Sequence, residues 1–157
     1  MSNQNSDIRA GLVKYASLIL NQRPYFRHKL KVKLLLRAKK LNYLEAAPVI
    51  DSILDDLQKS GYLNDSYLAA AFVRRQLTKG YGPRLIKIKM AQLRLDKTAI
   101  TLALETEADK KVQLESAKNY LAKKGALDRR KLIRILYQRG FDSQIINNLF
   151  DGDLYDV

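Results

Sequence analysis

The sequence contains no cysteine, no tryptophan and only one histidine, and this scarcity excludes several classes of protein. Without cysteine, the 157-residue chain has neither a disulfide framework nor a thiolate metal site. Its longest apolar runs span only a few residues, far short of a membrane span. Residues 1–7 are polar and lack the basic and apolar regions of a secretory signal. We therefore expect a cytoplasmic protein that does not span a membrane.

The residue pattern of a catalytic or metal site is also missing. His28 lies among basic residues and has no second metal ligand near it in the sequence. Asp51 and Asp55 are one helical turn apart and could hold a hard cation, although a solvated acidic face is the more common arrangement. Residues 80–84 lack the Gly-Lys-Ser/Thr ending of a phosphate loop. The sequence predicts a protein that is not an enzyme and that binds no metal or cofactor.

Basic residues outnumber acidic ones by 29 to 16, which gives a net charge of +13. They fall into three blocks, within Arg23–Lys40, Arg74–Lys97 and Lys123–Arg139. The first block contains no acidic residue, and each of the others contains one. This balance predicts an anionic partner, which could be a nucleic acid, an acidic protein surface or an anionic membrane face.

The three charge blocks indicate an internal repeat. An offset of 142 − 96 = 46 residues pairs apolar residues with apolar residues at helical spacing. The pairs that it brings together include Asp96 with Asp142, Met90 with Leu136, Leu95 with Phe141, and Ile100 with Ile146. The N-terminal part fits this repeat less well, because residues 39–47 read as a longer connection.

Apolar residues recur with the period of a helix throughout, and no segment alternates as a strand would. We expect an all-α protein of three tandem three-helix repeats, over residues 7–60, 61–106 and 107–152. Because so small a unit buries little apolar surface alone, the repeats should stack into an elongated, curved molecule. The expected helices cover roughly residues 8–23, 28–37, 48–60, 66–78, 83–94, 97–106, 111–124, 128–139 and 143–150.

The middle helices of the second and third repeats each have an apolar face and a basic face. Ile86, Met90 and Leu93 share one arc of the helical wheel, and Arg84, Lys87 and Arg94 share the opposite arc. One basic helix face is ordinarily just solvated, but three basic helices in one chain favour binding to phosphates or to an acidic protein. The candidate binding residues are Arg74, Arg75, Lys79, Arg84, Lys87, Arg94, Lys123, Lys124, Arg130, Lys131 and Arg134.

Three segments in the centre of the chain occur in a characteristic order. They are Gly61-Tyr62-Leu63-Asn64-Asp65, Phe72-Val73-Arg74 and Lys79-Gly80-Tyr81-Gly82-Pro83. Each alone is ordinary helix punctuation, since glycine ends helices and proline suits a first helical position. Together they resemble the central signature of the RecX family, small bacterial modulators of the RecA recombinase.

The resemblance implies tandem repeats similar to helix-turn-helix units and a partner, the RecA–DNA filament. It also implies inhibition of filament extension, of the recombinase ATPase and of strand exchange, and hence a regulator of recombination, DNA repair and the SOS response. DNA, single- or double-stranded, would be bound without regard to sequence, and the chain would be a monomer.

The chain departs from the family pattern at three positions. Lys29 and Lys89 stand where the family commonly has glutamate, and Arg94 replaces a helix-ending glycine. Three alternatives stay open. One is a helix-turn-helix transcription regulator, which would normally dimerise and read base edges. The second is a sequence-independent nucleic-acid binder without RecA specificity, and the third is a helical scaffold that binds only an acidic protein.

Overall fold

The structure is a computed structural model, and it describes residues 2–151. The described residues contain helices and no strand, which confirms the all-α prediction. Each helix in the described part of the chain is too short or too polar to span a lipid bilayer. In order along the chain the helices are α1 (Ser2–Gln22), α2 (Arg27–Lys40), α3 (Ala47–Lys59), α4 (Asp65–Thr78), α5 (Pro83–Gln92), α6 (Lys97–Glu107), α7 (Lys110–Ala122), α8 (Arg129–Gln138) and α9 (Ser143–Asp151).

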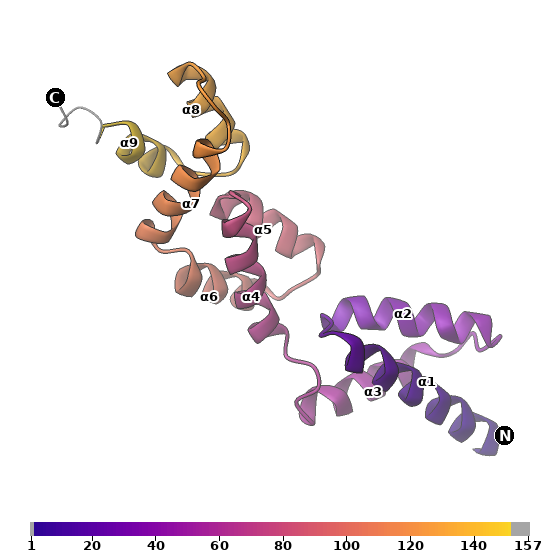
Figure 1. The fold of residues 1–157 in the computed structure, drawn as a ribbon. Helices are drawn as coiled ribbons and strands as arrows, with labels where there is room; N and C mark the ends of the chain where they lie inside the picture. The colour runs from indigo at the N-terminus through magenta and orange to yellow at the C-terminus, as the bar shows by residue number, and fades with distance from the viewer. Residues whose placement is uncertain (1, 152–157) are drawn as a thin grey trace. The chain divides into compact units, whose positions relative to one another are not determined.

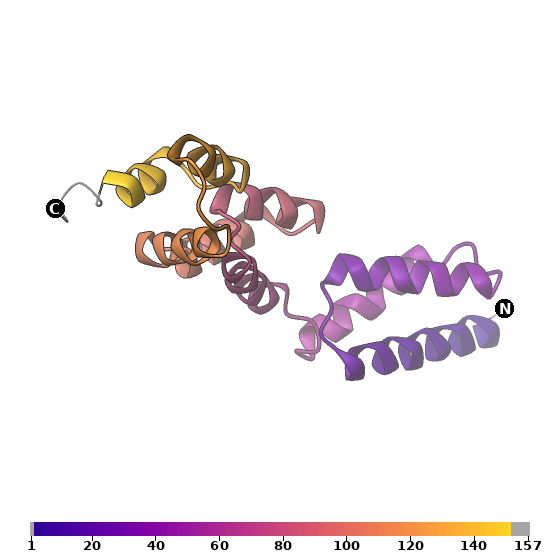
Figure 2. The same cartoon turned by 45° about the horizontal axis from the view of Figure 1, so that its top comes forward.

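Helices α1, α2 and α3 pack against one another as a three-helix bundle, which is the core of the first of two compact units (Figure 1). The same bundle is seen from another angle in Figure 2. Its core is aliphatic, and Leu12, Leu34, Ile50 and Leu54 are fully buried in it. This unit ends at Leu68, within the first turns of α4.

The second compact unit begins at Ala69 and contains the rest of α4 and the helices α5 to α9. Helix α5 packs on α6, and α9 packs on both α7 and α8. Phe141, in the connection between α8 and α9, is buried in the core between α7, α8 and α9 together with Leu136 and Ile146. All eleven candidate binding residues belong to this second unit.

The 46-residue repeat is visible in the helices of the second unit. Helices α5 and α8 start at residues 83 and 129 and end at 92 and 138, so both ends are 46 residues apart. Met90 and Leu136, which the repeat pairs, are both fully buried. The paired residues Asp96 and Asp142 also have the same role, since each accepts a backbone N–H at the start of the following helix. The repeat boundaries at residues 60 and 106 stay a prediction, as does the elongated, curved shape; residue 152 lies outside the described residues.

Helix ends follow the predicted punctuation. Gly80 and Gly140, which come after α4 and α8, have φ angles of +73° and +90°, a region that glycine enters without a Cβ clash. The N–H of the next residue then bonds back five residues, from Tyr81 to Gln76 O and from Phe141 to Leu136 O. Phe141, which follows Gly140, is buried, whereas Tyr62, which follows Gly61, is exposed.

Candidate nucleic-acid interface

All eleven candidate binding residues have exposed side chains. They lie on α4, on α5, on α8 and in the connections that follow α4, α5 and α7. Because all belong to one compact unit, their helices are held together by that unit's own packing.

The first turn of α5 is bonded to the last turn of α8. The Gly82 N–H donates to Arg139 O at 2.8 Å, and the Arg84 N–H donates to Gly140 O at 3.2 Å. The Arg84 guanidinium adds a third bond, from Nη2 to Tyr137 O at 2.6 Å. A helix leaves N–H groups free at its start and C=O groups free at its end, so each of these helix ends satisfies the other. The two most basic helices of the unit are thereby fixed to each other.

Two glycines allow this close approach of backbones. A Cβ on Gly82 would lie 2.3 Å from Gly140 C and 2.4 Å from Phe141 N. A Cβ on Gly140 would lie 2.5 Å from Leu85 N. These contacts are with backbone atoms, which cannot rotate away. We call this contact between residues 82–85 and 137–141 the α5–α8 junction.

A cluster of aromatic and basic side chains covers the junction. The Arg139 guanidinium lies between two tyrosine rings, 4.1 Å from the centroid of Tyr81 and 4.0 Å from that of Tyr120, and donates to Lys79 O. Lys89 Nζ lies 3.3 Å from the Tyr81 centroid and donates to Gln76 Oε1. The hydrogen bond from Arg139 and the charges of Lys89 and Arg139 lower the pKa of the Tyr81 hydroxyl. Arg139 and Lys89 therefore hold the turn, and the positive charge of each is already in contact with a ring.

Three residues of this cluster are absent from the candidates predicted from the sequence: Arg139, Lys89 and Tyr120. The glycine after Arg139 marked a helix end, but nothing local indicated that a ring 19 residues earlier in the chain would cover it. Lys89 contacts Tyr81 and Gln76, so this lysine is half-buried rather than part of the solvated basic face.

Four of the eleven candidates have partners within the chain. Arg74 forms an ion pair with Glu107, and Arg84 bonds to Tyr137 O as described. Arg75 and Lys124 lie over the rings of Phe72 and Tyr120. The other seven have no ion pair, side-chain hydrogen bond or ring contact to the rest of the described chain. We call these the seven unpaired cations: Lys79, Lys87, Arg94, Lys123, Arg130, Lys131 and Arg134.

The prediction for Arg94 was wrong in one respect. Helix α5 ends at Gln92, two residues earlier than expected, so Arg94 is not on the α5 wheel. Its φ is +57°, the left-handed conformation that a helix-ending glycine commonly adopts. A residue with a Cβ adopts this conformation at a cost of about 1–2 kcal/mol. The side chain is exposed, as predicted, but it leaves from the turn after the helix.

Acidic residues of α3 neutralise part of the first unit. Asp51 pairs with Lys31 at 2.6 Å, Asp55 pairs with Arg27 at 2.7 Å, and Asp56 pairs with an arginine on α1 at 2.7 Å. The carboxylates of Asp51 and Asp55 thus serve as ion-pair partners. Among the side chains that the structure describes, no group of three or more from His, Cys, Asp or Glu could hold a metal ion.

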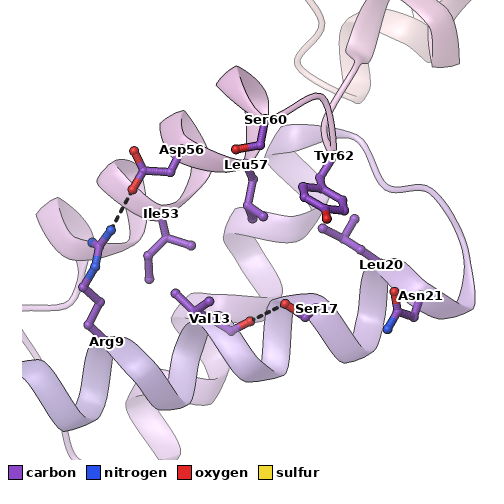
Figure 3. Close-up of a pocket in the computed structure, with 10 residues that line it drawn as sticks. All are labelled: Arg9, Val13, Ser17, Leu20, Asn21, Ile53, Asp56, Leu57, Ser60 and Tyr62. Atoms are coloured by element: carbon purple, nitrogen blue, oxygen red, sulfur yellow. Dashed lines mark hydrogen bonds and ion pairs between the residues drawn. The ribbon is translucent and has the colours of Figure 1, made fainter.

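A groove of about 490 Å³ runs between α1 and α3 (Figure 3). Val13, Ile53 and Leu57 point into it, and the Arg9–Asp56 ion pair crosses one end at 2.7 Å. Because its one cation is already paired, the groove adds no free positive charge.

A regulatory protein RecX of Xanthomonas oryzae pv. oryzae (strain PXO99A) is 32% identical to this chain over 152 residues, which cover 92% of this chain and 88% of the relative. That of Pseudomonas entomophila (strain L48) is 33% identical over 114 residues, covering 69% and 74%. The chain belongs to the RecX family.

Solved structures show that this RecX-family chain shares the fold of its relatives. The crystal structure of RecX from Lactobacillus salivarius matches with a TM-score of 0.78 at 22% identity, covering 95% of this chain and 99% of that one. A second crystal structure of a regulatory protein RecX matches with a TM-score of 0.77, covering 94% and 74%. No family model matches the sequence.

Proposed function

We propose that this RecX-family chain binds the RecA–DNA filament and inhibits filament extension, the recombinase ATPase and strand exchange. It would act as a cytoplasmic monomer, by binding rather than by catalysis, and would regulate homologous recombination and DNA repair. Membership of a family of regulatory proteins supports a regulatory role. The choice of the RecA filament rests on the central motif from Gly61 to Pro83.

The observation that carries the proposal is the set of unpaired cations on either side of the α5–α8 junction. Lys87 on α5 and Arg130, Lys131 and Arg134 on α8 are exposed and without ion-pair partners in the described chain. Because backbone bonds fix the two helices to each other, these cations meet a phosphate backbone or an acidic surface with little loss of freedom. Phosphates bound in this way release counterions, which drives the association.

The test is a binding and inhibition assay with RecA filaments, with and without DNA. The triple variant Lys87→Gln, Arg130→Gln and Arg134→Gln removes three unpaired cations and keeps good helix formers at each site. We expect its melting temperature to stay near that of the wild type and its inhibition of the RecA ATPase to weaken at least tenfold. Arg84 is left in place because its side chain bonds to Tyr137 O in the junction.

The matched control is Lys110→Gln, Lys111→Gln and Lys118→Gln. These three exposed lysines lie on α7 in the same compact unit, so the change in net charge is equal. Equal loss of inhibition in both triple variants would mean that only overall charge matters, and the proposed site would be wrong. Binding to DNA that RecA does not alter would favour the nucleic-acid binder without RecA specificity, and a footprint confined to a palindrome would favour the transcription regulator.

A further inference from the structure

Helix α2, in the first compact unit, has apolar side chains on its solvent face. Val32 and Leu36 are 43% and 58% exposed, whereas Leu30, Leu34 and Ala38, on the other side of the helix, are buried in the core. Exposed aliphatic residues are common singly, but these two are four residues apart and therefore adjacent on one helix face.

Lysines surround this apolar pair. Lys33, Lys39 and Lys40 lie three residues before, three after and four after Leu36, which places all of them beside it on the helix. Lys29 lies three residues before Val32 and completes the arrangement. We call the whole set the α2 lysine–leucine face, and it consists of Lys29, Val32, Lys33, Leu36, Lys39 and Lys40.

The positive charge of this face is not neutralised within the unit. The carboxylates of α3 pair with Lys31 and Arg27, which lie on the side of α2 toward that helix. Lys29, Lys39 and Lys40 have no ion pair among the described residues, and Lys33 lies over the Tyr25 ring at 5.7 Å. A hollow of about 200 Å³ beside Leu36 is lined by Tyr15, Lys33, Leu36, Arg37 and Lys40. The hollow therefore offers an apolar surface between cationic side chains, and no acidic residue lines it.

We propose that the α2 lysine–leucine face docks an acidic amphipathic helix of a partner protein. An apolar side chain of that helix contacts Leu36 and Val32, and carboxylates on either side of it pair with the lysines. A phosphate backbone would use the lysines but gain nothing from the exposed leucine and valine. An anionic membrane surface needs a larger apolar face than two aliphatic side chains to hold a helix.

This inference does not rest on the proposed function, because the unpaired cations of the α5–α8 region belong to the other compact unit. The two surfaces are therefore tested with separate variants and separate ligands. Loss of one binding activity would leave the other in place.

The probe is a synthetic helical peptide of about 20 residues, long enough to be helical alone, with leucines along one face and glutamates on both sides of them. Binding of the fluorescent peptide to the full chain is measured by anisotropy. We expect Leu36→Gln to weaken binding about tenfold. The matched control is Leu18→Gln on α1, since Leu18 is 57% exposed in the same unit and has no ring of lysines; it should change affinity less than about twofold.

Further measurements separate this proposal from other ligands and from a purely structural role of Leu36. A polyglutamate peptide of equal charge should bind the wild type more weakly than the leucine-bearing peptide, and Leu36→Gln should leave affinity for duplex DNA unchanged. Equal binding of the two peptides would overturn the proposal, because charge alone would then explain it.

Leu36-dependent binding to phosphatidylglycerol vesicles, without binding of the peptide, would assign the face to a membrane instead. A fall in melting temperature for Leu36→Gln well beyond that of Leu18→Gln would mean that the chain itself covers Leu36.

Discussion

Gly82 shows how a single missing methyl group can matter at the α5–α8 junction. Its backbone is ordinary, with φ −83°, so alanine would cause no dihedral strain there. The Cβ would instead lie 2.3 Å from Gly140 C, and backbone atoms cannot move aside cheaply. We expect Gly82→Ala to lower the free energy of unfolding by about 1–3 kcal/mol, the range for overpacking. Thermal or urea unfolding measures this.

The control for this substitution is Gly11→Ala. Gly11 lies inside α1, and nothing stands within 4 Å of where its Cβ would be. Alanine there should raise stability by about 0.5–1 kcal/mol, because glycine is costly within a helix. If the two variants shifted the unfolding transition in the same direction, the close approach at residues 82 and 140 would be contradicted.

Tyr81 offers a second residue-scale test, through its titration. The hydrogen bond from Arg139, followed by the charges of Lys89 and Arg139, lowers the pKa of its hydroxyl below the usual 10.0. Lys89→Gln removes one of these charges and leaves the backbone bonds of the junction intact, so it should raise the pKa toward 10. NMR of ¹³C-labelled tyrosine measures the shift, and Tyr81→Phe identifies the resonance. A wild-type Tyr81 that titrated at or above 10 would argue against the stacked cluster.

At the scale of helices, the N-cap of α6 predicts a dependence of stability on pH. Asp96 accepts the N–H of Thr98 at 2.9 Å and that of Ala99 at 3.4 Å, and the Thr98 bond is the main reason that its pKa lies below 3.8. Because the folded pKa is lower than the unfolded one, the ionised cap stabilises the fold fully above the unfolded value. This contribution is lost as pH falls below 3.8 and through the folded pKa.

The test compares Asp96→Asn with the wild type between about pH 6 and pH 2. Asparagine can still accept the bonds of the cap but does not titrate, so the melting temperature should fall less steeply in acid than it does for the wild type. Asp96→Ala should lower the melting temperature at neutral pH as well, because the N–H groups of Thr98 and Ala99 lose their acceptor. If the melting temperatures of Asp96→Asn and the wild type fell equally with pH, the ionised Asp96 cap would not be the cause of the loss of stability in acid.

For the whole molecule, the net charge of +13 and the seven unpaired cations predict how DNA binding depends on salt. If all seven contacted phosphates of a duplex, the logarithm of the binding constant would fall with the logarithm of salt with a slope of at most about −6. Affinity should differ little between unrelated sequences, since such contacts do not read bases. The triple variant Lys87→Gln, Arg130→Gln and Arg134→Gln should reduce this slope by up to about three. A slope near zero, or a strong preference for one sequence, would exclude this mode of binding.

Much of the helical structure could be predicted from the sequence because its signals are local. Apolar spacing of three and four residues, helix-ending glycines and capping acids all act within a few positions of one another. The expected helix at 143–150 agrees with α9 (Ser143–Asp151) within one residue, and Met90, on the expected apolar arc, is fully buried. The 46-residue repeat could also be predicted from the sequence, since it depends only on such spacings.

Only the tertiary structure decided which basic residues remain available. Arg84 and Arg134 look alike in sequence, yet Arg84 bonds to a carbonyl 53 residues away and Arg134 has no such partner in the described chain. Lys89 and Arg139 likewise have a partner within the chain, because the charged group of each lies over the Tyr81 ring. The physical reason is that the partner of a basic side chain depends on which helices are in contact. The contact between α5 and α8 depends on the close approach of Gly82 to Gly140, which residue spacing along the chain does not predict.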